Sequence, residues 1–193
     1  MERLRTALSF GGILNKEEVD EAVLHFEPRR IKAGDDFVSI GRITDELGFI
    51  DEGIIRGFIR SENGEEATKY FLRQNQFIMD IESYYNNTPS ENGFQAMVDT
   101  NILSIRRKGW NELTEKFPKL YILTKSLTEA ALLNKIKDND FLNFGTASEK
   151  YKEFMKRYPD VALQVPQQYI ASYLKITPQS LSRIRKEMGT KSK

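Results

Sequence analysis

Five polar side chains near the end of the sequence have the chemistry needed to contact a nucleic acid. Each can hydrogen-bond a base edge or a phosphate: Gln179, Ser180, Ser182, Arg183 and Lys186. Leu181, Ile184 and Met188 repeat at i, i+3 and i+7 among them, which predicts a helix with one apolar and one polar face. Along residues 178–186 the polar face carries no acidic residue, whereas an ordinary solvated helix mixes both signs. The pattern favours a surface that contacts DNA.

This helix has a strong start signal and a second helix directly before it. Thr177 can accept a backbone N–H of the first turn, and Pro178 occupies a position whose own N–H would have no helical partner. The preceding segment, residues 166–174, has apolar residues at i, i+1 and i+4: Ile170, Ala171 and Leu174. Two amphipathic helices joined by a tight turn predict a helix-turn-helix, although such pairs also occur as packing units without DNA.

Residues 169–186, with the sequence YIASYLKITPQSLSRIRK, closely resemble the helix-turn-helix of Crp/Fnr-type bacterial transcription regulators. Residues 148–159 resemble the helix that precedes this motif in the family. One position departs, because Lys175 stands where the turn usually has glycine, and a left-handed backbone there costs about 1 kcal/mol. Few residues follow position 188, so we expect a winged-helix-like domain without the strands that follow in other members.

The resemblance also implies partners and roles. It implies an inverted-repeat operator in double-stranded DNA, a homodimer, RNA polymerase and an unknown small-molecule effector. Arg183 falls on the position of the family's guanine-reading arginine. Its planar guanidinium can donate two hydrogen bonds to the two acceptors of guanine in the major groove. We therefore expect Arg183 to be the main base-reading residue, assisted by Gln179 and Ser180. Three residues are better placed for phosphates: Gln167, Thr177 and Lys186.

Charge is distributed unevenly along the 193 residues. Residues 148–193 carry a net charge of +6 and residues 1–147 a net charge of −5, which predicts a nucleic-acid partner for the C-terminal part alone. We expect three parts: a jelly-roll sensor domain (1–109), a dimerisation helix (110–137) and a helix-turn-helix DNA-binding domain (138–193).

The composition argues against several other chemistries. The sequence has no cysteine, which excludes disulfides, thiolate metal sites and cysteine nucleophiles. His25 is the only histidine and lies at the end of a helix expected over residues 15–26, so a structural or solvent-facing role is favoured over a metal or haem ligand. No apolar run approaches the roughly 20 residues of a membrane span, and the N-terminus lacks a secretory signal. We expect a cytoplasmic protein that is not an enzyme, with no metal, no cofactor and no membrane partner.

Residues 30–107 alternate short β-rich runs with turn residues, which predicts a sandwich or barrel. Seven strands are expected, at residues 29–32, 37–40, 47–51, 53–60, 67–72, 94–98 and 101–106. The clearest signal is a hairpin that turns at Asn63 and Gly64. Before a helix-turn-helix, this segment resembles the family's cyclic-nucleotide-binding jelly roll. The expected fold class is therefore α+β.

The family's nucleotide site, a Gly-Glu pair and an arginine triplet, is degenerate here. Residues 77–80 and 94–96 stand at those places, and no Arg or Lys lies between Arg73 and Arg106 to neutralise a phosphate. Residues that remain as candidates for a different effector pocket are Phe77, Met79, Asp80, Phe94 and Gln95. The aromatic side chains can equally pack in a core. Asp80 and Glu82 could form a displaced acid pair or serve as catalytic carboxylates, but the favoured alternative is that they are ordinary polar residues at a loop or helix start.

A long helix is expected over residues 111–137, followed by a hinge at 138–145. Its apolar residues have coiled-coil spacing and are expected to form a dimer seam: Leu113, Phe117, Leu120, Leu123 and Leu127. The alternative is a helix buried against its own barrel.

The leading prediction is a dimeric, DNA-binding transcription regulator. A cupin-type enzyme would need several metal-binding histidines, and the sequence has one. A protein-interaction or orphan ligand-binding module, with a helix-turn-helix that no longer contacts DNA, remains the alternative.

Overall fold

The structure is a computed structural model that describes residues 1–190, so the last three residues of the predicted DNA-binding domain lie outside the described residues. The strands are β1 (Glu27–Ile31), β2 (Asp36–Val38), β3 (Glu46–Glu52), β4 (Ile54–Arg60), β5 (Glu66–Arg73), β6 (Phe77–Ile78), β7 (Asn92–Ala96) and β8 (Thr100–Arg106). The helices are α1 (Glu2–Leu8), the 3-10 helix η1 (Phe10–Gly12), α2 (Lys16–Leu24), α3 (Ile81–Asn86), α4 (Arg107–Lys116), α5 (Lys119–Asn143), α6 (Ala147–Arg157), α7 (Pro159–Gln164), α8 (Gln167–Leu174) and α9 (Pro178–Thr190).

Two antiparallel four-stranded sheets form the sandwich, with strand orders β1-β8-β3-β6 and β2-β7-β4-β5. All seven expected strands are present, with ends shifted by at most two residues, and the two-residue strand β6 is additional. The β4–β5 hairpin turns where expected, because Gly64 adopts the positive φ of 84° that this turn requires. Apolar side chains from both sheets fill the space between them, among them Ile50, Ile55 and Ile102. The α+β jelly-roll architecture is confirmed.

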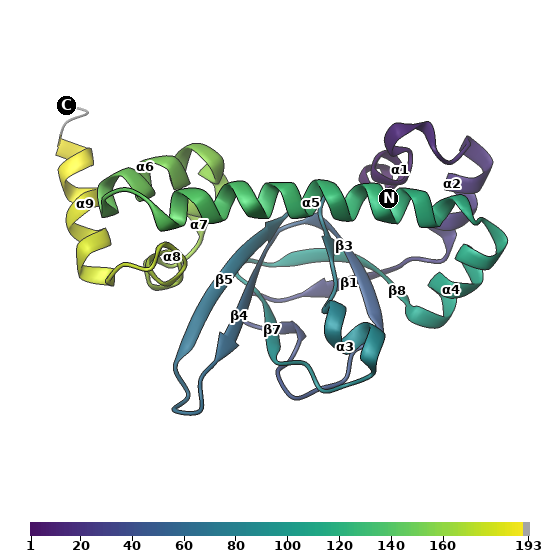
Figure 1. Cartoon of the computed structure of the whole chain (residues 1–193), viewed down its shortest axis with the longest axis horizontal. Coiled ribbons are helices and arrows are strands. Elements are labelled where there is room, and N and C mark those ends of the chain that lie inside the picture. Colours follow the sequence, from purple (N-terminus) through teal and green to yellow (C-terminus); the bar gives the residue numbers. More distant parts are fainter. Residues whose placement is uncertain (191–193) are drawn as a thin grey trace.

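Helices cover one end of the sandwich. Asn15 caps α2 through a reciprocal capping box with Glu18, as the sequence suggests, whereas α1 was not expected. In Figure 1, α1 and α2 lie beside the start of α5, and the C-terminal helices gather at its other end. Leu4, Leu8 and Val23 from the N-terminal helices join a core that includes the first turns of α5.

The long helix expected over residues 111–137 is two helices, and this prediction was wrong in three respects. Pro118 disfavours helical backbone at Phe117, which has φ −123° and ψ 80°, so α4 ends there and α5 starts after the proline. The first helix begins at Arg107, four residues before the expected start at residue 111. Finally, α5 continues through most of the predicted hinge to Asn143, because no breaker precedes Gly145, whose φ is 89°.

The apolar face predicted to meet a partner chain packs inside this chain. Leu113, Leu120 and Leu123 are at most 1% exposed, and Phe117 and Leu127 pack partly buried against the same core of α1, α2 and β3. Side chains as enclosed as these three leucines are not available to a second chain, so the predicted dimer seam is wrong at Leu113, Leu120 and Leu123, and there the alternative of a helix buried against its own barrel holds. Seven-residue spacing marks an apolar stripe without specifying what covers it.

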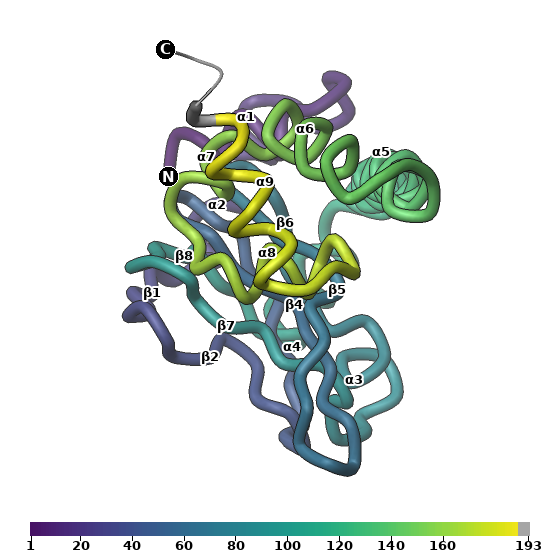
Figure 2. The backbone as a smooth tube through the Cα atoms, turned by 90° about the vertical axis from the view of Figure 1, so that its left-hand side faces the viewer, coloured from purple at the N-terminus to yellow at the C-terminus, as the bar shows by residue number. Residues whose placement is uncertain are grey.

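The C-terminal helices pack on one another and on the second sheet. Their core contains Phe154, Leu174 and Leu181, together with Ile54 and Phe71 from strands β4 and β5. Figures 1 and 2 both show α8 beside β5. The helical unit therefore packs directly on the sandwich. Among residues 1–190, no strand follows β8.

Candidate nucleic-acid interface

The turn between α8 and α9 has the backbone that the motif requires. Lys175 adopts the left-handed conformation, with φ 56° and ψ 42°, despite having a side chain. The N–H groups of Lys175 and Ile176 donate to the carbonyls of Ser172 and Ala171, over 3.1 and 3.0 Å, and so satisfy the end of α8. Ala171 is fully buried where a larger side chain would push the helices apart. The two expected helices and their tight turn are confirmed.

Thr177 starts α9 in the expected way. Its Oγ1 accepts the backbone N–H of Ser180 over 3.1 Å, and its hydroxyl donates to the Ser180 Oγ over 2.9 Å. The hydroxyls of both residues are thus engaged with each other in this structure. Any contact that either makes with DNA uses its remaining lone pairs or requires the hydroxyl to rotate.

The two faces of α9 are as the apolar spacing predicts. Leu181 is 0% and Ile184 5% exposed, both inside the C-terminal core. On the opposite side Gln179, Ser182 and Arg183 are exposed. The Arg183 Nε lies 3.9 Å from a Glu187 carboxylate oxygen, and its side chain is 75% exposed. An ion pair this exposed contributes about 0–1 kcal/mol, so it leaves Arg183 able to turn toward another acceptor.

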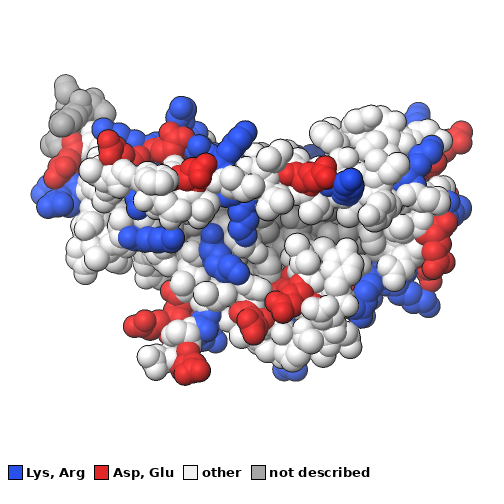
Figure 3. Space-filling view, in the orientation of Figure 1, with Lys and Arg blue, Asp and Glu red and all other residues white. Residues whose placement is uncertain are grey.

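Other polar side chains of the motif differ in their exposure. Gln167 is exposed at the first position of α8, and Lys186 is exposed on α9. Arg185, which faces the other way, donates from Nη2 to the Ala162 carbonyl over 2.8 Å and lies 5.8 Å from the centre of the Tyr151 ring. It therefore holds α9 to α6 and α7. In Figure 3, blue atoms form the left-hand tip of the molecule, where Figure 1 places α9, with red atoms beside them.

The space between the two sheets is occupied by side chains. Phe94, at the first place of the expected arginine triplet, is 1% exposed and lies in the core of the sandwich. Its ring centre is 6.2 Å from that of Tyr70, whose pKa burial raises to about 12. A Cβ on Gly57 would lie 2.5 Å from the Tyr70 ring, so this glycine permits the tyrosine to fold inward. Tyr70 was not among the expected site residues.

Asp80 has a structural role in this region. It caps α3, accepting the Ser83 N–H over 3.1 Å, and also accepts bonds from the Ser90 hydroxyl and the Asn92 side-chain amide. Burial alone raises its pKa, but the hydrogen bonds from Ser90, Ser83 and Asn92 outweigh that effect and hold the pKa below its usual value. The favoured interpretation of Asp80 as a polar residue at a helix start is confirmed.

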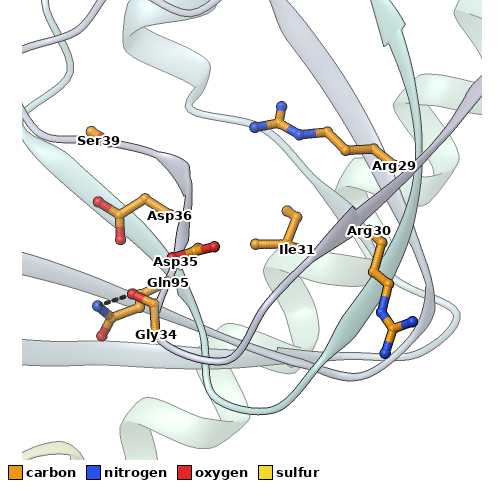
Figure 4. Close-up of a pocket in the computed structure, with 8 residues that line it drawn as sticks. All are labelled: Arg29, Arg30, Ile31, Gly34, Asp35, Asp36, Ser39 and Gln95. Atoms are coloured by element: carbon orange, nitrogen blue, oxygen red, sulfur yellow. Dashed lines mark hydrogen bonds between the residues drawn. The ribbon is translucent and has the colours of Figure 1, made fainter.

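The five residues grouped as an effector pocket do not share a cavity. Phe77 and Met79 pack against the core beneath α1 and α2, whereas Phe94 lies between the sheets. Gln95 points outward and donates to the Gly34 carbonyl over 2.9 Å, as Figure 4 shows. Because neighbouring strand residues face opposite sides, Phe94 and Gln95 cannot line one pocket, so that grouping was wrong.

Gln95 instead borders an open depression of about 510 Å³ between β1 and β2. Both arginines there have carboxylate partners: Arg29 lies 2.9 Å from Glu46, and Arg30 lies 2.8 Å from Asp99. Both cations are thus already paired with carboxylates in this structure. His25 is exposed beside the last turn of α2, and residues 1–190 contain no cluster of three side chains that would hold a metal ion. No helix within the same range is long and apolar enough to cross a membrane.

Together, the sandwich, the long helix and the helix-turn-helix define the fold of the Crp/Fnr-type regulators. Residues 28–117 match the family model described as cyclic nucleotide-binding domain. No curated protein matches the sequence closely enough to count as a relative.

Three solved structures illustrate the similarity. The Thermus thermophilus catabolite activator protein shares 20% identity over 96% of this chain and 88% of that chain, with a TM-score of 0.58. FixK2 from Bradyrhizobium japonicum shares 14% identity over 86% of each chain, with a TM-score of 0.74. The c-di-GMP responsive global regulator CLP of Xanthomonas campestris shares 12% identity over 92% of this chain and 93% of that chain, with a TM-score of 0.70. At these identities the similarity establishes the fold.

Proposed function

We propose that this protein is a dimeric, sequence-specific DNA-binding transcription regulator of the Crp/Fnr type that works in the cytoplasm. The observation that carries the proposal is the division of α9, whose apolar residues are buried and whose Gln179, Ser182 and Arg183 face solvent. A helix held by its inner face on a second helix, with hydrogen-bonding side chains outward, suits the major groove of DNA. The folds of the similar solved structures support the same function.

The outer face of α5 is the proposed dimer contact, in place of the buried seam. Four apolar residues on it are each 51 to 59% exposed: Ile122, Leu132, Leu133 and Ile136. They are exposed whereas Leu120 and Leu123 of the same helix are fully buried, so α5 has apolar side chains that are covered and others that are not. Paired recognition helices need a two-fold axis to contact two half-sites, and a second copy of α5 would provide it.

The sensor domain is proposed not to bind a cyclic nucleotide between its sheets. Phe94 and Tyr70 fill the space, and both arginines at the depression beside Gln95 are paired with carboxylates. A buried cyclic phosphate would lose its hydration without a compensating charge. Calorimetry with cyclic AMP should therefore show no binding at micromolar concentrations, and micromolar affinity would contradict this part of the proposal.

Selection from random duplex DNA tests the main proposal. The full-length protein should enrich an inverted repeat whose half-site centres lie about 34 Å apart, one turn of the double helix. Affinity should fall with salt, with a slope of about −0.9 for each phosphate neutralised. Failure to enrich any sequence, with only weak salt-dependent binding, would favour the interaction module with a DNA-inactive motif.

A further inference from the structure

A buried arginine joins the sensor domain to the helix-turn-helix. Arg56 of β4 is 1% exposed although it carries a charge. Its guanidinium lies 4.2 Å from the centre of the Phe58 ring on the same strand and 3.9 Å from the centre of the Tyr169 ring on α8. One Nη donates to the carboxylate of Glu66 on β5, and Nε has no hydrogen-bond partner among the described residues. The cation is stacked between a sheet residue and a residue of the DNA-binding helices.

The burial of Arg56 depends on α8. Phe58 and Glu66 belong to the sensor hairpin and stay beside Arg56 whatever the helices do, whereas Tyr169 closes the other side of the guanidinium. If α8 moved away, that side of the charge would be open to water. Stacking on Tyr169 therefore favours the arrangement in which α8 is docked on the sensor domain.

Neighbouring contacts cross the same boundary. The Thr68 N–H of β5 donates to the Ser172 Oγ of α8 over 2.9 Å. The Phe71 ring packs edge-on against Tyr173 with centres 5.5 Å apart. Both partners in α8 lie three or four residues after Tyr169, one helical turn along, so the whole length of this short helix is seated on the sheet.

We propose that Arg56 is a positioning residue for DNA recognition: by stacking on Tyr169 it fixes α8, and with it α9, at one angle to the sensor domain and α5. The inference rests on the proposed function. In a dimer joined through α5, the angle of each helix-turn-helix to its own sensor domain sets the separation of the two recognition helices. The clamp of Phe58, Arg56 and Tyr169 therefore selects the half-site spacing, whereas the exposed residues of α9 select the half-site sequence.

The test uses four variants of the full chain. Arg56→Met keeps the length of the side chain and removes its charge, and Tyr169→Leu removes the ring from the other side of the boundary. Tyr169→Phe keeps the ring and should behave as the wild type. Arg60→Met is the matched control, because Arg60 lies on the same strand and binds the same Glu66 over 2.7 Å but is half exposed and not stacked on α8. If Arg56→Met does not fold, Tyr169→Leu still tests the clamp, since Tyr169 lies outside the sandwich.

Two measurements distinguish the clamp from the proposed function. The first is binding to duplexes that carry the selected half-sites at a series of spacings. Wild type, Tyr169→Phe and Arg60→Met should strongly prefer one spacing. In Arg56→Met and Tyr169→Leu that preference should fall about tenfold or more, the loss expected for a desolvated stack, with the half-site sequence unchanged.

The second measurement is hydrogen exchange of the Thr68 amide, which needs no DNA. It should speed up by about tenfold or more in Arg56→Met and Tyr169→Leu and stay unchanged in both controls. Unchanged exchange in the first two variants would overturn the clamp. Faster exchange with an unaltered spacing profile would overturn its role in spacing. A wild type that binds no DNA would refute the proposed function, and Thr68 exchange would still decide whether Arg56 holds α8.

Discussion

Replacing Leu120 by alanine separates the two apolar faces of α5. The Leu120 side chain is 0% exposed in the core formed by α1, α2 and the first sheet, so its truncation leaves a cavity that the surrounding helices can fill only partly. Losing a buried leucine in this way costs about 2–5 kcal/mol, and full burial places the expectation in the upper half of that range. Total stabilities of domains are about 5–15 kcal/mol, so the effect is large.

Urea denaturation followed by tryptophan fluorescence measures this loss directly. Trp110, the only tryptophan, packs partly buried against the same core, with its ring centre 6.3 Å from that of Phe26. The matched control is Leu133→Ala on the outer face, where 59% of the residue is exposed and the cost within one chain should stay within about 0.5 kcal/mol. A Leu120→Ala protein that became monomeric but kept its wild-type midpoint would refute the placement of Leu120 inside the chain.

Two further predictions follow from the same contacts. Replacing Leu133 and Ile136 together by aspartate should yield a monomer with a folded sandwich, because two charges then face the proposed partner helix. Light scattering at micromolar concentration measures the mass, and a double variant that kept the mass of a dimer would contradict the proposed contact through α5. The depressed pKa of Asp80 adds stability that is present at neutral pH, above its unfolded-state pKa, and is lost as pH falls through the lower folded-state pKa. Asp80→Asn should therefore be less stable than wild type at pH 7, by about 1–3 kcal/mol, and should lose less stability on acidification. If the free energy of unfolding fell in parallel with pH in both proteins, this role of Asp80 would be wrong.

Local signals were sufficient for much of this fold. Thr177 and Pro178 define the start of α9 through their own backbone chemistry, and the left-handed turn at Lys175 follows from the short spacing between two apolar faces. The hairpin at Gly64 is similarly local. The recognition face could be predicted for the same reason, since turning Leu181 inward necessarily turns Arg183 outward.

The errors concern contacts between distant residues. The spacing of Leu113 and Leu120 predicts an apolar stripe, but only the positions of α1 and α2 show that the stripe is covered within the chain. The break at Pro118 was a local signal that outweighed a long periodic pattern. Tyr70 and Arg56 have no marker in the sequence: Tyr70 folds inward because Gly57 opposite lacks a side chain, and Arg56 is buried only because α8 covers it.

The central claim is that the exposed face of α9 reads DNA bases, and the most direct measurement is the affinity of Arg183→Ala for the selected operator and for every single-base change in one half-site. Arg183→Ala should lose about 1–3 kcal/mol and should no longer discriminate at one position per half-site. The control is Arg30→Ala, another exposed arginine with one carboxylate partner, which lies on β1 away from α9 and should bind as the wild type does. Equal affinity and equal selectivity of Arg183→Ala and wild type would contradict the account.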